Sequence, residues 1–234
     1  QIYTASENRL ALQELLPEAI ISCYDSYDDS QLSHLLDWAD VVCIGCGLGM
    51  GQISEKILKN VLKNVSCPCV IDADGLNLLS RNIELLNQCC APVILTPHMK
   101  EMSRLTRWSI DTIMEDRFQA LDQIIKQSGP DTKSSIICVL KDIRTVVAQT
   151  NRQRFVNLAG NNSMAKGGSG DVLAGTIAGL LAQHMAPFEA TTVGVFLHAC
   201  GGVEAKKSKG SYSVLARDLI QGMADAMKNA KECR

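Results

Sequence analysis

Asn161-Asn162-Ser163-Met164-Ala165-Lys166-Gly167-Gly168-Ser169-Gly170-Asp171 is a glycine-rich segment that leads directly into the apolar run Val172-Leu173-Ala174-Gly175-Thr176-Ile177-Ala178-Gly179-Leu180-Leu181. Three glycines within four residues disfavour a helix or strand interior, because glycine loses the most backbone freedom on ordering. The apolar residues after them recur at helical spacing, so the pattern predicts a loop that opens a helix. The first N–H groups of a helix have no partner within it, and together with the helix dipole they attract anions. We therefore predict a phosphate loop made of Gly167, Gly168, Ser169 and Gly170.

Asp171 stands where the predicted loop becomes a helix. A carboxylate at this point can serve simply as a helix cap. Capping alone does not require the neighbouring glycines, so we interpret Asp171 as a catalytic carboxylate beside an anion site. The order of residues differs from the Walker phosphate loop, in which a lysine follows the last glycine.

The composition favours a soluble globular enzyme. The chain has 234 residues, 46% of them apolar and 21% charged, with a net charge of −2. This charge provides no basic surface for nucleic acid, and no apolar run reaches the length of about 18 residues that a membrane span requires. The first residues lack the pattern of a secretory signal, which favours the cytoplasm as location.

The ten cysteines are interpreted as free thiols of a reducing compartment. Cys43, Cys69 and Cys138 lie inside apolar runs, where cysteine acts as a small hydrophobic residue. The pairs Cys67/Cys69 and Cys89/Cys90 lack zinc-ligand spacing, so we predict no protein-bound metal.

Short apolar runs alternate with helical patterns along the chain, which predicts a mainly parallel sheet covered by helices on both faces. The predicted strands are 20–23, 41–44, 69–71, 92–95 and 136–140, followed by a hairpin of 145–149 and 154–157 with its turn near Asn151. The predicted helices are 7–16 (capped by Ser6), 31–38, 52–64, 76–79, 100–105, 113–127, the helix after Asp171, 187–206 and 214–228, with a loop at 82–88. Without repeats or linkers, residues 1–234 are predicted to form a single domain. Because residues 1–4 resemble a strand entered midway, this domain is predicted to be N-terminally incomplete, with its first strand missing.

Five polar or glycine-rich motifs each follow a predicted strand or open a helix. In open parallel sheets, ligands bind beyond the carboxyl ends of the strands, so the motifs are expected to share one rim. They are residues 45–49, 72–77, 96–101, 141–145 and 161–171. Five such motifs indicate a ligand site more strongly than any one alone.

Three of these motifs leave a choice between structure and function. Gly45-x-Gly47-x-Gly49 suits a tight turn or a close backbone approach to a sugar or phosphate, and it departs from the dinucleotide fingerprint. Asp72, Asp74 and Asn77 suit a helix cap, a ribose contact or a metal-bound water.

His98 follows a strand directly, and we expect it to contact a ligand, since imidazole can donate and accept at neutral pH. The other histidines have no such context and are expected on the surface or in helix packing: His34, His184 and His198. Lys141-Asp142-Ile143-Arg144-Thr145 offers cations and a hydroxyl for phosphate.

In this order, the motifs resemble those of the ADP/ATP-dependent NAD(P)H-hydrate dehydratases of the ribokinase-like superfamily, from Val41 to about Ile220. Residues 45–49 are similar to the family's Gly-Pro-Gly-Leu-Gly, residues 72–77 to Asp-Ala-Asp-Ala-Leu-Asn, and residues 95–101 to Leu-Thr-Pro-His-Pro-Gly-Glu. Residues 141–145 resemble the Lys-Gly-x-x-Thr nucleotide loop, and residues 161–173 the Asn-x-x-Met-Ala-Thr-Gly-Gly-Ser-Gly-Asp-Val-Leu motif. The resemblance implies a ribokinase-like three-layer αβα sandwich.

The resemblance also implies an activity: a hydro-lyase that repairs hydrated NADH and NADPH with ADP or ATP and Mg²⁺. By position, Gly47, His98 and Asp171 would contact the hydrated nicotinamide nucleotide. The adenine nucleotide would be held by Lys141, Asp142, Ile143, Arg144, Thr145 and Gly170. The supporting set is Asp72, Asp74, Asn77, Glu101 and Asn161. A homo-oligomer, with a tetramer favoured, and an upstream or separate epimerase are further implied partners.

Some residues depart from the family pattern. Cys46 replaces proline, Met99-Lys100 replaces Pro-Gly, Asp142 replaces glycine and Lys166 replaces threonine. Asp142 places a carboxylate near the phosphates, which predicts weaker nucleotide binding. The family's opening strand and its Gly-Ser-x-x-Tyr-x-Gly-Ala loop are not found in this sequence. Two alternatives are therefore kept: a small-molecule kinase acting on a vitamin precursor or sugar alcohol, and a nucleotide-binding remnant without catalysis.

Overall fold

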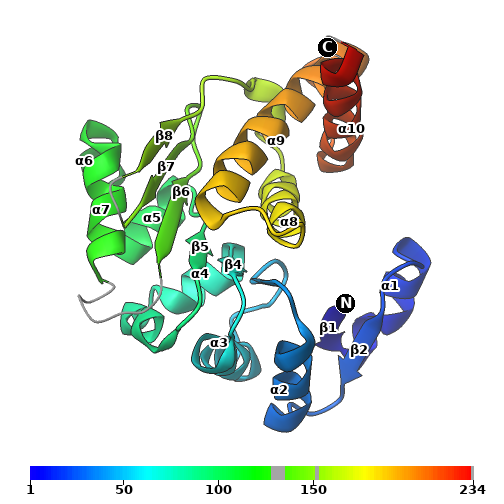
Figure 1. Cartoon of the computed structure of the whole chain (residues 1–234), viewed down its shortest axis with the longest axis vertical. Helices are drawn as coiled ribbons and strands as arrows, with labels where there is room; N and C mark the ends of the chain where they lie inside the picture. The colour runs from blue at the N-terminus through cyan, green and yellow to red at the C-terminus, as the bar shows by residue number, and fades with distance from the viewer. Residues whose placement is uncertain (128–134, 151–152, 233–234) are drawn as a thin grey trace.

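A six-stranded sheet forms the centre of the computed structural model, which describes residues 1–127, 135–150 and 153–232 (Figure 1). Its strands lie side by side in chain order: β3 (Val42–Ile44), β4 (Cys69–Ile71), β5 (Val93–Leu95), β6 (Ile136–Leu140), β7 (Val146–Gln149) and β8 (Arg154–Val156). The strands β3 to β6 are parallel, and β7 and β8 add an antiparallel hairpin. The prediction of a mainly parallel sheet is therefore confirmed.

Helices cover both faces of this sheet. On one face lie α8 (Ser169–Leu181) and α9 (Pro187–Lys209), with α10 (Ala216–Glu232) packed against α9. On the other lie α2 (Asp29–Trp38), α3 (Gln52–Asn64), α4 (Ala73–Leu79), α5 (Met99–Thr106), α6 (Ile110–Glu115) and α7 (Arg117–Gln127). Side chains alternate along each strand, so Val70 and Ile94 pack toward α8 while Ile71 and Leu95 pack toward α3 to α5. The predicted three-layer sandwich is confirmed.

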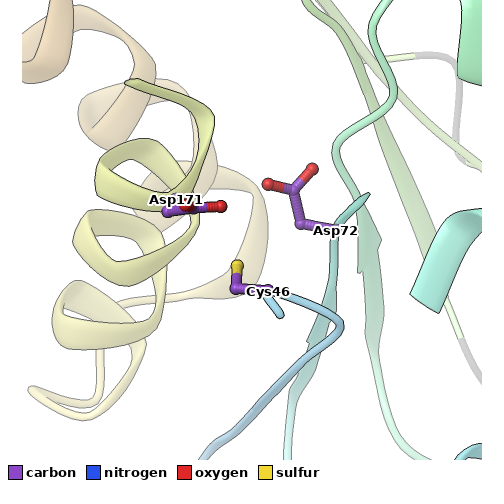
Figure 2. Close-up of side chains that lie close together, drawn as sticks. All are labelled: Cys46, Asp72 and Asp171. Carbon is purple, nitrogen blue, oxygen red and sulfur yellow. The ribbon is translucent and has the colours of Figure 1, made fainter. Parts of the chain in front are cut away.

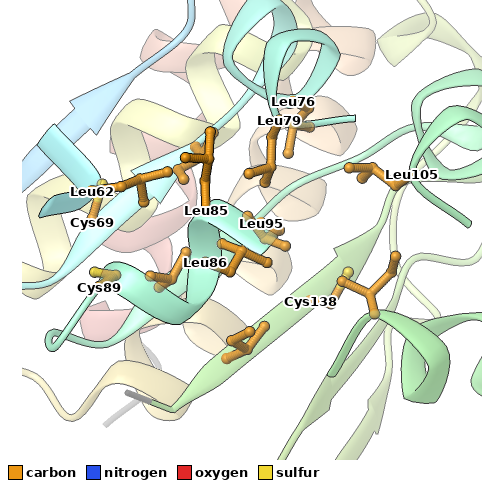
Figure 3. Close-up of a cluster of buried hydrophobic side chains, with 14 of the residues drawn as sticks. Leu62, Cys69, Leu76, Leu79, Leu85, Leu86, Cys89, Leu95, Leu105 and Cys138 are labelled. Carbon is orange, nitrogen blue, oxygen red and sulfur yellow. The ribbon is translucent and has the colours of Figure 1, made fainter. Parts of the chain in front are cut away.

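The largest of the three hydrophobic clusters among the described residues lies between the sheet and helices α2 to α7 (Figure 3). Its leucines and small thiols are almost completely buried, among them Leu62, Leu86, Cys69 and Cys138. Burying one such leucine stabilises the fold by about 2 kcal/mol.

Several helix boundaries differ from the predicted ones because local capping decides them. The predicted helix 113–127 is two helices, since Asp116 interrupts it and accepts a hydrogen bond from the Gln119 amide at 2.9 Å. Similarly, Asp218 accepts from the Leu215 amide at 2.8 Å where α10 begins. Helix α8 starts at Ser169, so Gly170 belongs to its first turn and not to the preceding loop.

Other predicted elements shift by a few residues. Helix α4 begins at Ala73, α9 continues to Lys209, and the predicted loop at 82–88 contains the 3-10 helix η2 (Ile83–Gln88). The predicted first helix is a 3-10 turn, η1 (Ser6–Asn8), followed by α1 (Arg9–Leu15), and Ser6 makes no capping bond. A further 3-10 turn, η3 (Asn162–Met164), precedes the glycine loop. The predicted turn near Asn151 lies outside the described residues.

The N-terminal strands form a separate two-stranded parallel sheet, β1 (Ile2–Ala5) with β2 (Ile21–Tyr24). This pair lies apart from the main sheet (Figure 1). Between β1 and β3 runs a groove of about 970 Å³, whose walls include α2 and α8. Each of these two strands has a hydrogen-bonded neighbour on one side only within the described sheets.

None of the helices in the described ranges is long and apolar enough to cross a membrane.

Candidate active site

The predicted motifs meet at the carboxyl ends of the parallel strands. Lys141 and His98 form a bridge beyond β5 and β6, and the Lys141 amide donates to the Pro97 carbonyl at 2.8 Å. The N-terminus of α8 lies directly opposite. A methyl group added at Gly170 would lie 3.1 Å from Lys141 Nζ and 3.4 Å from Asp72 Oδ2. Residues far apart in the sequence thus share one rim.

Asp72 and Lys141 form a buried ion pair at the centre of this rim. Lys141 Nζ lies 2.6 Å from Asp72 Oδ1 and 4.0 Å from Glu101 Oε2. The Asp72 side chain is 1% exposed and that of Lys141 is 18% exposed. A charge buried to this degree is stable only with a partner, so each residue holds the other in place. Asp72 precedes α4 as its N-cap residue but makes no capping bond with its side chain.

Asp171 is the third residue of α8, and the N-cap is Gly168 in a left-handed conformation with φ of +85°. The simple capping role considered for Asp171 is therefore wrong. Its exposed carboxylate lies within the positive end of the helix dipole and is turned toward Asp72 (Figure 2). A carboxylate there can accept a proton from a ligand that the loop amides bind.

The turn from Gly45 to Gly49 is a tight turn, which is one of the two functions considered for it. A side-chain carbon at Gly45 would lie 1.9 Å from the Asp72 carbonyl oxygen, so glycine is required where β3 and β4 end. The Gly49 amide donates to Asp74 Oδ2 at 2.9 Å, which fixes the far end of the turn. Gly47 has a φ of +67° and open space around its missing side chain, which leaves room for a ligand.

His98 is the N-cap of α5. Its Nδ1 accepts from the amides of Lys100 and Glu101 at 3.1 and 3.2 Å, while Glu101 Oε2 accepts from the His98 amide at 2.9 Å. Nε2 lies 3.4 Å from Glu101 Oε1, so both ring nitrogens face groups of the same helical turn. Burial raises the pKa of Glu101. The His98 side chain remains 48% exposed.

The remaining supporting residues hold the scaffold. Asn77 Oδ1 accepts from Arg104 at 2.6 Å. Asn161 accepts from the Ser163 amide at 3.0 Å and donates to the Gly202 carbonyl at 2.9 Å, which joins the glycine loop to α9.

The loop 141–145 contains a neutralised carboxylate. Asp142 pairs with Arg117 of α7 at 2.8 Å, so the expected repulsion of phosphates by Asp142 is offset by a cation that the sequence reading did not foresee. The Thr145 hydroxyl donates to the Asp142 carbonyl at 3.3 Å, and Ile143 and Arg144 are exposed.

His198 of α9 is a residue of the site that sequence reasoning missed. It is 8% exposed, and its Nε2 lies 3.3 Å from Ser169 Oγ at the start of α8. Burial lowers the pKa of His198 to about 4, so the ring is neutral at pH 7. Helix packing was one of the two expectations for it, but no motif in α9 marks the contact with the start of α8.

Cys46 joins the carboxylates of Asp72 and Asp171. The ligand atoms of these three side chains all lie within 4.8 Å of one another (Figure 2). The pKa of the Cys46 thiol is raised, chiefly by its hydrogen bond with Cys43 and further by burial and by Asp171. The same hydrogen bond lowers the pKa of Cys43.

The expectation that Cys43 is a core residue is wrong. It is an exposed free thiol, whereas Cys69 and Cys138 are buried as expected. Cys43-Ile44-Gly45-Cys46 has the C-x-x-C spacing of a metal or redox pair, a signal that the sequence reading overlooked.

Solved structures share this fold. The chain superposes on a ribokinase-like superfamily protein from Enterococcus faecalis with a TM-score of 0.76 and 33% identity, over 97% of this chain and 75% of that one. An ADP/ATP-dependent NAD(P)H-hydrate dehydratase from Bacillus subtilis, co-crystallised with ATP/Mg²⁺, gives a TM-score of 0.76 at 26% identity, over 96% of this chain and 76% of that one. The sheet, its helical layers and the glycine-loop rim thus define a ribokinase-like α/β protein.

Sequence relatives narrow the class. A family model described as NAD(P)H-hydrate dehydratase matches residues 1–224. An ADP-dependent (S)-NAD(P)H-hydrate dehydratase from Neisseria meningitidis is 34% identical over 93% of this chain and 73% of its own length. The chain belongs to the NAD(P)H-hydrate dehydratase family. It is also 36% identical to a bifunctional NAD(P)H-hydrate repair enzyme from Moorella thermoacetica over 82% of this chain, and it spans 35% of that enzyme's length.

Proposed function

We propose that this protein dehydrates the (S)-epimer of hydrated NADH and NADPH to NADH and NADPH, with ADP or ATP as phosphoryl donor. Membership of the family and the names of the relatives support this reaction. One observation carries it: the exposed carboxylate of Asp171 lies at the amino end of α8, opposite the buried pair of Asp72 and Lys141.

In the proposed reaction, the substrate is a nicotinamide ring with water added across its C5–C6 bond. Asp171 accepts the proton of the C6 hydroxyl while the hydroxyl oxygen bonds to the terminal phosphorus of the nucleotide. The bond from that phosphorus to the nucleotide breaks and releases AMP from ADP, or ADP from ATP. The new phosphate ester at C6 then leaves as inorganic phosphate, assisted by the ring nitrogen, and the C5 proton is lost.

The chain's own groups stabilise the charge that moves. Amides at the start of α8 face the transferring phosphoryl group, where the helix dipole favours negative charge. Gly170 permits close approach, because a side chain there would meet Lys141 at 3.1 Å. We assign the hydrated ring to Gly47, His98 and Asp171, and the adenine nucleotide to residues 141–145 with Gly170.

Mg²⁺ fits this site as a partner of the nucleotide. Asp72 Oδ2 faces the start of α8 and is an oxygen donor, the kind of donor that Mg²⁺ prefers. Bound there with the nucleotide, Mg²⁺ would neutralise part of the negative charge of the nucleotide phosphates.

The direct test follows the absorbance of reduced nicotinamide. Hydrated NADH is incubated with the protein and ADP, ATP or no nucleotide. We expect absorbance to return with a nucleotide and not without one. Failure of both nucleotides, in protein shown to be folded by circular dichroism, contradicts the proposed reaction.

We also propose that residues 1–234 act as one cytoplasmic domain that works as a homo-oligomer. Exposed apolar side chains of α9, Val193 and Phe196, support self-association. The bifunctional names of several relatives support a second activity alongside this one, for which the resemblance implies an epimerase.

We further propose that one more strand completes the sheet, since the groove between β1 and β3 separates two unpaired strand edges.

A further inference from the structure

We propose that Cys46, Asp72 and Asp171 form a binding site for a thiophilic divalent cation such as Zn²⁺. All three ligand atoms lie within 4.8 Å of one another. Zn²⁺ lies about 2.3 Å from a thiolate sulfur and about 2.0–2.2 Å from a carboxylate oxygen, so small side-chain rotations bring all three donors to one ion. Three protein ligands leave a fourth position for water or a ligand.

The surroundings of two ligands favour such an ion. Asp72 is buried, and Lys141 holds its Oδ1 at 2.6 Å, while Oδ2 faces α8. A hydrogen bond to one carboxylate oxygen orients the other for a metal. Asp171 comes from the opposite side of the rim, on a different element, so the donors surround a common point (Figure 2).

A second thiol lies beside the site. Cys43 pairs with Val70, which packs toward α8, so the Cys43 side chain lies on the same face of the sheet as α8. Cys43 lies in β3, three residues before Cys46. This C-x-x-C spacing is one that zinc sites use.

The donor set selects the metal. Mg²⁺ and Ca²⁺ take oxygen ligands, whereas a thiolate with two carboxylates suits the borderline-soft ion Zn²⁺. A cation bound at this site is coordinated by the Asp171 carboxylate. If the proposed function holds, Zn²⁺ therefore blocks proton acceptance and inhibits the enzyme, while Mg²⁺ does not.

Spectroscopy tests binding without any reference to activity. The fully reduced protein is titrated with Co²⁺, which gives a thiolate-to-cobalt absorption band in the near ultraviolet when sulfur coordinates, and Zn²⁺ is then added to displace it. We expect the parent protein to bind one Co²⁺ per chain. Cys46→Ser should lose the absorption band, and it should bind Co²⁺ at least about 10-fold more weakly than the parent, which is the low end of the loss that even an outer-shell change causes. Cys90→Ser, which removes another exposed thiol, should keep the band.

Three results would overturn the site: no sulfur band in the parent protein, a band retained in Cys46→Ser, or a band lost in Cys90→Ser. Thermal unfolding of each variant excludes loss of fold, and Cys46→Ala provides a second removal of the thiol. Since the band is read in the absence of substrate, its result is independent of whether the dehydratase reaction occurs.

Discussion

At the scale of single residues, the position of Asp171 decides what it can do. The helix cap is Gly168, so the Asp171 carboxylate is not needed to satisfy the first amides of α8. It stays exposed at the positive end of the helix, with Asp72 and Cys46 as its neighbours. An exposed carboxylate that does not cap the helix is suited to accept a proton at this position.

Asp171→Asn should lower turnover by about 100-fold or more, the usual contribution of a general base, because an amide cannot take the hydroxyl proton. The melting temperature should change little, since the side chain caps nothing. Asp225→Asn, at an exposed position of α10, is the matched control and should keep full turnover. Turnover within a few-fold of the parent, or a lower melting temperature with weakened ADP binding in calorimetry, would show that Asp171 is structural.

At the scale of elements, the ends of the strands and the start of α8 position the site. Gly45 directly follows β3, and a side chain there would collide with the carbonyl of Asp72, which directly follows β4. Helix α9 supports α8 from behind through His198 and Ser169. The site therefore depends on two close contacts between neighbouring elements.

Gly45→Ala should destabilise the fold by several kcal/mol, because the new carbon would lie 1.9 Å from a backbone oxygen that cannot move without shifting β4. Gly47→Ala is the matched control, since its φ of +67° is also left-handed but the space around it is open. It should cost only about 1–2 kcal/mol. Urea unfolding of the two variants measures this difference, and equal losses would contradict the steric explanation.

The contact between α8 and α9 should make stability depend on pH. The pKa of His198 is lowered to about 4 in the folded protein, against about 6.5 in the unfolded chain. Above pH 6.5 both states hold the ring neutral and no stability is lost. As pH falls from 6.5 toward 4, only the unfolded chain gains the proton, so up to about 3 kcal/mol of stability is lost. His198→Gln removes this titration, and unfolding midpoints at pH 7 and 5 should then differ less than in the parent. Equal pH dependence in both proteins would refute the assignment.

At the scale of the whole molecule, the strands form two separate sheets. Within the described residues, six strands form the main sheet and two form the N-terminal pair, and the groove between the two sheets has an unpaired strand edge on each side. Unpaired strand edges invite association with other chains. Solved relatives are longer than this chain, which covers 75% to 79% of several of them.

Extending the chain upstream of Gln1 with a strand taken from one of these relatives should raise the melting temperature and the activity together, because the strand would fill the groove and pair both edges. An extension of the same length and composition in scrambled order is the control. If the two extended proteins melt at the same temperature, the groove does not take a strand.

The parts of the site that could be predicted from the sequence are those formed by residues that follow one another in a short motif. The segment from Gly167 to Asp171 and the acidic motif at Asp72 each signal a strand end or helix start by themselves, and topology then brings them together. Arg117 and His198 reach the site from α7 and α9 through packing alone, and no local pattern marks such contacts. The pair Cys43 and Cys46 did carry a spacing signal, but the apolar run around Cys43 suggested a core residue instead.

The buried pair of Asp72 and Lys141 has a thermodynamic consequence for the arrival of ligands. A phosphate that attracts the Lys141 ammonium takes it from a carboxylate that is only 1% exposed. Asp72 must then gain another cation, since an isolated buried charge is too costly to keep. In the proposed reaction, nucleotide binding is therefore linked to uptake of a metal ion. Calorimetry should accordingly give a higher affinity for ADP with Mg²⁺ than without it.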